Sequence, residues 1–104
     1  MAGGTIRFRV FFLHQRDGPV NPSNLTLKIY EGNQLATLLS TVTIYQDVYG
    51  IGSYFGDYNV PSSQGTGPLT AVWNGTYESI GTSAALPVQA MQPFRVINEM
   101  GIVN

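Results

Sequence analysis

Cysteine is absent from this chain of 104 residues, and charged residues are scarce. The lack of cysteine excludes disulfides, thiolate nucleophiles and cysteine-ligated zinc or iron–sulfur sites. Charged residues make up 11% of the sequence, whereas a typical soluble domain carries about 25%. A net charge of −1 provides no basic field that would attract nucleic acid or an acidic membrane. Because few charges also mean weak self-repulsion, the composition permits close packing against neighbouring subunits.

Long apolar segments are missing as well. No run of apolar residues approaches the roughly 18 residues that a membrane-spanning helix requires. The opening MAGGTIRFRV lacks the basic, apolar and small-residue order of a signal peptide. We therefore expect a protein that folds in a cytosol and has no membrane partner.

Catalytic motifs are the third absence. His14 is the only histidine, and we interpret it as an exposed residue at a strand end, because lone histidines are usually structural. The sequence contains no nucleophile elbow, phosphate-binding loop or HExxH motif. Asp17, Asp47 and Asp57 are expected near strand ends without the spacing of a calcium loop, so a calcium site is the weaker alternative. We predict that the chain is not an enzyme and holds no cofactor or metal.

Short alternating segments dominate what is present. Apolar and polar residues alternate with the period of a half-buried strand, and glycine, proline and asparagine separate the segments. This period places Tyr54, Tyr58 and Trp73 in the core. Strands are predicted over residues 5–13, 25–32, 38–45, 53–60, 68–77 and 86–96. Six or seven short strands without a convincing helix indicate an antiparallel sandwich or barrel, and the single central tryptophan favours the sandwich.

Five segments follow one another in a defined order over about nine-tenths of the chain. They are TIRFRVFF (5–12), DGPVNPSNLTLKIYEG (17–32), GIGSYFGDYNVP (50–61), TGPLTAVWNGT (66–76) and PFRV (93–96). Together they resemble the small immunoglobulin-like structural proteins of tailed bacteriophages. The resemblance implies an immunoglobulin-like β-sandwich of about seven strands over residues 1–97, followed by a C-terminal arm at 98–104.

The resemblance also implies a role. Proteins of this kind are virion components without enzymatic activity, assembled in the cytoplasm of the host bacterium. The expected function is a capsid decoration or cement subunit that binds the major capsid protein, and a homo-oligomer is an accompanying possibility. A component of the head–tail junction or tail is the alternative within this class. A module that adheres to carbohydrate or the cell surface is the alternative from another class.

Candidate partner-binding residues are those that the alternation leaves outside the core. Phe11 and Leu13 lie on the face of the first strand opposite Phe8 and Phe12, beside Arg7 and Arg9. An apolar patch there is a liability in a monomer and a contact in an assembly. Two rings outside the core, Tyr49 and Phe55, are the candidates for stacking on a host glycan. The arm adds the apolar residues Met100, Ile102 and Val103.

Deletion of residues 98–104 gives the first test. If the arm orders against a neighbouring subunit, the truncated domain should remain folded in isolation and be incorporated less into the particle, because terminal segments are ordered only where they are tied down. Circular dichroism measures the fold, and the protein content of purified particles measures incorporation. A truncated chain that unfolds would place the arm in the core and contradict the prediction.

Overall fold

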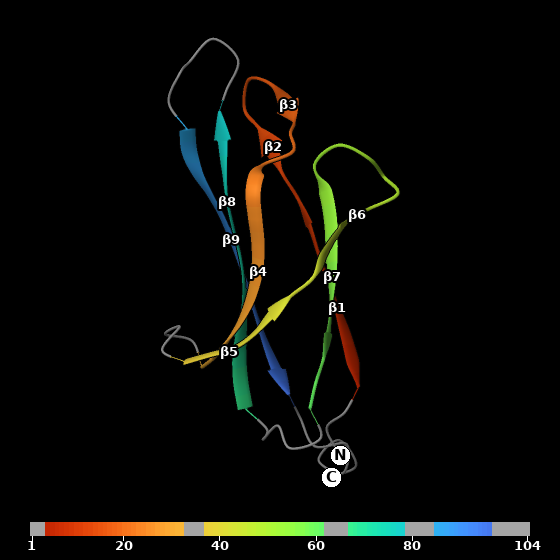
Figure 1. The fold of residues 1–104 in the computed structure, drawn as a ribbon, viewed down its shortest axis with the longest axis vertical. Coiled ribbons are helices and arrows are strands. Elements are labelled where there is room, and N and C mark those ends of the chain that lie inside the picture. Colours follow the sequence, from red (N-terminus) through yellow and green to blue (C-terminus); the bar gives the residue numbers. More distant parts are fainter. Residues whose placement is uncertain (1–3, 33–36, 62–66, 79–84, 97–104) are drawn as a thin grey trace.

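The computed structural model describes residues 4–32, 37–61, 67–78 and 85–96, and these ranges form strands and connecting turns without a helix (Figure 1). The strands are β1 (Thr5–Phe11), β2 (Leu13–His14), β3 (Gly18–Pro19), β4 (Ser23–Glu31), β5 (Thr37–Val42), β6 (Ile44–Gln46), β7 (Ser53–Asn59), β8 (Gly67–Glu78) and β9 (Ala85–Val96). All the pairings between them are antiparallel. The all-β prediction is therefore confirmed.

The predicted strand count of about seven is too low for this part of the chain. The segment predicted as one strand over 5–13 is divided at Phe12 into β1 and β2, and the segment over 38–45 is divided at Thr43 into β5 and β6. The two-residue strand β3, which pairs with β2, was also not anticipated. Both divisions occur where the chain changes its pairing partner without a glycine or proline, so no breaker residue marks them in the sequence.

Two main sheets face each other (Figure 1). One has four strands in the order β5-β4-β8-β9, and the other has three in the order β1-β7-β6. Two prolines in the predicted last strand, Pro87 and Pro93, lie in β9 at an edge of the larger sheet, which is where a residue without an N–H donor is tolerated.

The core lies between the inner faces of the two sheets. Trp73 is completely buried, and Tyr58 contributes from the opposite sheet, as the alternation predicts. The third predicted core ring, Tyr54, is partly buried against this cluster. The buried cluster consists of Phe8, Phe12, Val20, Leu27, Ile29, Val42, Tyr58, Val60, Leu69, Ala71 and Trp73.

A single extended segment closes one side of the molecule by passing from one sheet to the other. Figure 1 shows β5 and β6 as a continuous yellow ribbon that runs from β4 toward β7. Val42 pairs with Leu27 of β4, and Ile44, two residues later, pairs with Gly56 of β7. A Cβ atom at Gly56 would lie 2.7 Å from Leu27 Cδ2 and 3.1 Å from the Thr43 carbonyl oxygen. Glycine at this position therefore lets the crossing segment and the core pack closely.

Gln92 of β9 joins the two sheets on the other side. The indole Nε1–H of Trp73 donates to Gln92 Oε1 at 3.0 Å, and Gln92 Nε2 donates to the Arg9 carbonyl oxygen at 2.7 Å. Nearby, the rings of Phe8 and Phe94 meet edge to face with their centroids 4.9 Å apart. Gln92 thus satisfies a buried donor of one sheet and binds the edge strand of the other.

Replacement of Gln92 by alanine should lower the free energy of unfolding by about 1–3 kcal/mol, because the Trp73 indole N–H then loses its acceptor in the protein interior. Gln89→Ala is the matched control, since Gln89 lies on the same strand and its exposed side chain donates to Asn74. The control should change stability by about 0.5 kcal/mol or less. Urea unfolding of the two variants provides the measurement, and equal losses would show that the Gln92 bridge does not stabilise the fold.

Candidate functional site

The outward face of the three-stranded sheet carries three of the predicted partner-binding residues. Arg7 and Arg9 of β1 lie directly opposite Asp57 and Phe55 of β7, respectively, in the strand register. On the far side of β7, Phe55 pairs with Tyr45 of β6. We call this surface the outer face; it consists of Thr5, Arg7, Arg9, Tyr45, Phe55, Asp57 and Asn59.

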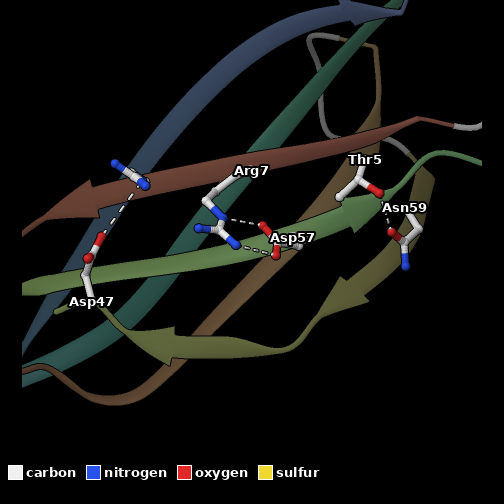
Figure 2. Close-up of polar contacts among 6 residues, drawn as sticks. Thr5, Arg7, Asp47, Asp57 and Asn59 are labelled. Carbon is white, nitrogen blue, oxygen red and sulfur yellow. Dashed lines mark hydrogen bonds and ion pairs between the residues drawn. The ribbon is translucent and has the colours of Figure 1, made fainter.

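Polar pairs across β1 and β7 order this face (Figure 2). Arg7 donates from Nε to Asp57 Oδ1 at 2.7 Å and from Nη2 to Asp57 Oδ2 at 2.9 Å. Two residue pairs further along, Thr5 Oγ1 donates to Asn59 Oδ1 at 2.8 Å. The hydrogen bonds from the Arg7 guanidinium hold the pKa of Asp57 below its ordinary value, and they raise the pKa of Arg7. Asp57 is therefore ionised and held in one orientation at neutral pH.

The rings on the outer face are not equally accessible. The Arg7 guanidinium carbon lies 4.3 Å from the centroid of the Phe55 ring, in cation–π geometry. The Tyr45 ring lies against Phe55 with a centroid distance of 5.5 Å. Phe55, which the sequence indicated as a stacking ring, is half-buried by these two neighbours, whereas the Tyr45 side chain is 54% exposed. The accessible ring of this face is therefore Tyr45, which was not among the candidate site residues.

A hollow of about 410 Å³ adjoins the outer face where β5 and β6 diverge from β7. Tyr45, Asp57 and Asn59 belong to both the hollow and the outer face. The lining consists of Ser40, Thr41, Val42, Thr43, Tyr45, Asp57, Tyr58 and Asn59. Most of these residues carry a hydroxyl, amide or carboxylate group, so the hollow is suited to a ligand with many hydrogen-bonding groups.

A second candidate surface lies at one end of the molecule, where the β2–β3 turn and the β6–β7 connection project (Figure 1). We call it the apolar end; its exposed residues are Phe11, Leu13, Val48, Tyr49 and Ile51. The Val48 side chain is 92% exposed and that of Tyr49 is 77% exposed. Three of the five, Phe11, Leu13 and Tyr49, were predicted from the sequence. The others lie in a connection that has no periodicity to reveal which side chains face outward.

Gly52 allows the two parts of the apolar end to approach each other. The backbone of Gly52 has a φ of +87°, and a Cβ atom there would lie 2.7 Å from the Phe12 carbonyl oxygen. Its carbonyl oxygen accepts from the Phe12 N–H at 2.9 Å, and its N–H donates to Asn21 Oδ1 at 2.9 Å. Only glycine accommodates both the positive φ and the close approach of the Phe12 carbonyl oxygen without strain. The connection is therefore fixed beside Phe11, whose ring carbon lies 3.2 Å from the same Cβ position.

The prediction of an exposed His14 is wrong, because the imidazole is half-buried in a local polar network. Its Nδ1 accepts hydrogen bonds from the backbone N–H groups of Arg16 and Asp17, each at 3.1 Å. In the neutral ring this assigns the proton to Nε2. The His14 ring also packs against Tyr77, whose hydroxyl donates to Asp17 Oδ2 at 2.6 Å and thereby has its pKa raised. These contacts attach the β2–β3 turn to β8.

The remaining predicted residues, Met100, Ile102 and Val103, lie outside the described residues. Within the described ranges, no group of three or more histidine, aspartate and glutamate side chains is placed to hold a metal ion. The same ranges contain no helix with the length and hydropathy to cross a membrane. No family model matches the sequence, and neither a curated protein nor a solved structure matches it.

The Arg7–Asp57 pair predicts a specific pH dependence. The pKa of Asp57 in the folded protein is lowered from its ordinary value of 3.8. The stability that the Asp57 carboxylate contributes is therefore fully present above the pKa of the unfolded chain, and it is lost as the pH falls through the lower pKa of the folded protein. The wild type should therefore be more stable than Asp57→Asn at neutral pH, and the difference should shrink below about pH 4. Urea unfolding between about pH 7 and pH 2 measures this difference.

The double variant Arg7→Gln/Asp57→Asn is the control for this experiment. It should show the same weaker acid dependence as Asp57→Asn, since the carboxylate is absent from both. A stability difference between wild type and Asp57→Asn that stays constant across the pH range would contradict the assigned cause.

Proposed function

We propose that this chain is a structural protein of a tailed bacteriophage particle, with an immunoglobulin-like β-sandwich that binds the major capsid protein as a decoration or cement subunit. The proposal assigns it to the virion, after assembly in the cytoplasm of the host bacterium. Its support from the sequence is the ordered set of five segments from TIRFRVFF (5–12) to PFRV (93–96).

The observation that carries the proposal is the apolar end. Its five large apolar side chains are exposed at the adjoining ends of β1 and β2 and on the β6–β7 connection, which a hydrogen bond from the Phe12 N–H to the Gly52 carbonyl oxygen holds together. Grouped apolar residues of this kind are typical of protein–protein contact sites, whereas singly exposed apolar residues need no explanation. Loops positioned by a rigid scaffold are also where binding surfaces commonly lie. A capsid surface that covers this end would remove the apolar groups from water.

The polar side chains support a binding role rather than catalysis. His14 Nδ1 accepts two backbone N–H groups, so its neutral tautomer presents no free lone pair for general base catalysis. The carboxylate of Asp57 is held by Arg7. Because His14 and Asp57 are both held by these hydrogen bonds, they support the proposal of a binding role.

The same apolar surface also fits the alternative position at the head–tail junction or tail. The chemistry of contact is the same in each case, and what differs is the virion protein that covers the apolar end. A homo-oligomer formed through this end is a further arrangement that the low charge of the chain permits. Mass spectrometry and electron cryo-microscopy of purified particles distinguish these positions directly.

Substitution at the apolar end tests the docking surface. Val48→Ser and Tyr49→Ser should each reduce incorporation into particles by about tenfold, because burial of a large apolar side chain contributes about 1.5–3 kcal/mol. Both variants should retain the wild-type melting temperature, since the two side chains are largely exposed.

Leu38→Ser is the matched control, because Leu38 is an exposed apolar residue of β5 that does not belong to the apolar end. It should leave incorporation unchanged. Equal incorporation of all three variants would exclude the apolar end as the docking surface, and absence of the chain from purified particles would overturn the proposed function itself.

A further inference from the structure

The hollow beside the outer face arises from the way the sheets are joined. β7 pairs with β6 only through Tyr54, Phe55 and Gly56, whereas its residues 57–59 pair with β1 alone. The segment that precedes β6 turns away there to pair with β4. The space left between residues 40–43 and 57–59 is the hollow of about 410 Å³. This volume lies toward the small end of the 300–1,000 Å³ range that is usual for small-molecule sites.

Most of the residues that line this space carry hydrogen-bond donors or acceptors, and Asp57 is the charged residue among them. Ser40, Thr41 and Thr43 each provide a hydroxyl group that can donate and accept. The Asp57 carboxylate has about four acceptor positions, and the two hydrogen bonds from Arg7 occupy two of them. Its negative charge is offset by the same guanidinium, so the hollow provides acceptors with little net field.

An aromatic ring borders the polar groups. The Tyr45 side chain is 54% exposed, and its ring is supported by contact with Phe55. The Phe55 ring is in turn covered by the guanidinium of Arg7. Tyr45 is thus a supported, accessible ring next to a carboxylate and several hydroxyl groups, which is an arrangement that offers both a stacking surface and hydrogen bonds.

From this arrangement we propose that the hollow binds a neutral carbohydrate, with an apolar face of a sugar ring stacked on Tyr45 and hydroxyl groups bound by Asp57 and the threonines. An apolar ligand would leave the polar lining unpaired, which is costly on desolvation. A ligand carboxylate would be repelled by Asp57, and a cation would compete with Arg7 for it. A neutral polyhydroxyl compound meets every group with a partner.

This site differs from the glycan surface expected from the sequence, which consisted of Tyr49 and Phe55. Tyr49 belongs to the apolar end, and Phe55 acts beneath Tyr45 as its support. The inference is independent of docking to a capsid, because only the apolar end is used for that contact.

Titration of the ¹⁵N-labelled full chain with the methyl glycosides of glucose, galactose, mannose and N-acetylglucosamine tests the proposal. At least one glycoside should shift the amide signals of residues 40–45 and 57–59, with a dissociation constant on the order of millimolar, as befits a small open site. Glucuronate should bind more weakly than methyl glucoside. An absence of shifts at these residues with all four glycosides, or tighter binding of glucuronate, would overturn the proposal.

Two tyrosine variants identify the stacking ring. Tyr45→Ala should weaken binding by about tenfold, whereas Tyr49→Ala should bind as the wild type does. Asp57→Asn should also weaken binding, because one carboxylate acceptor becomes an amide donor. Retained affinity in Tyr45→Ala would overturn the assignment of Tyr45 as the stacking ring. A site that instead pairs an extended peptide with the backbone of β7 would also not depend on the Tyr45 ring. Val48→Ser should bind sugar normally, which separates this result from that of the docking experiment.

Discussion

The bridge formed by Gln92 is the interaction on which the two-layer arrangement depends. Trp73 is completely buried, and its indole N–H requires an acceptor inside the protein, where an unpaired donor is costly. Gln92 supplies that acceptor and uses its own N–H to bind the Arg9 carbonyl oxygen of the opposite sheet. One side chain therefore satisfies the most buried ring and holds β1 against β9. The outer face is built on that same β1, so its geometry depends on this internal contact.

On the opposite side of the molecule, the two sheets are joined by a covalent crossing of the chain, and this crossing creates the hollow. There the chain itself joins the sheets, because β5 and β6 are consecutive parts of one extended segment. The crossing brings Val42 and Thr43 close to Gly56, where a larger residue would meet Leu27. Since the segment leaves β7 at this point, the remainder of β7 has a neighbour on one side only. The hollow is thus a direct result of how the two sheets are joined, and not a defect in their packing.

The alternation of side chains predicted much of this arrangement. It assigned Trp73 and Tyr58 to the core and Arg7 to the outward face, because a period of two depends only on neighbouring residues. It did not predict the role of Tyr45, which follows from the register between β6 and β7. Nor did it predict the burial of His14, which depends on Tyr77, far away in the sequence. Pairings between distant strands determine such contacts, and no local pattern contains them.

The distribution of the few charges explains why the two candidate surfaces differ. Arg7 pairs with Asp57 on the outer face, and Arg9 Nε lies 3.8 Å from Oδ2 of Asp47 in the β6–β7 connection, so both arginines of the outer face have a compensating carboxylate. Paired, exposed charges of this kind add little stability, but they orient hydrogen-bonding groups and keep a surface hydrated. The apolar end has no comparable pairs among its five residues and offers water little to bind. A macromolecular partner gains most by covering the apolar end, and a small polar ligand gains most in the hollow, so one small framework can serve both without competition.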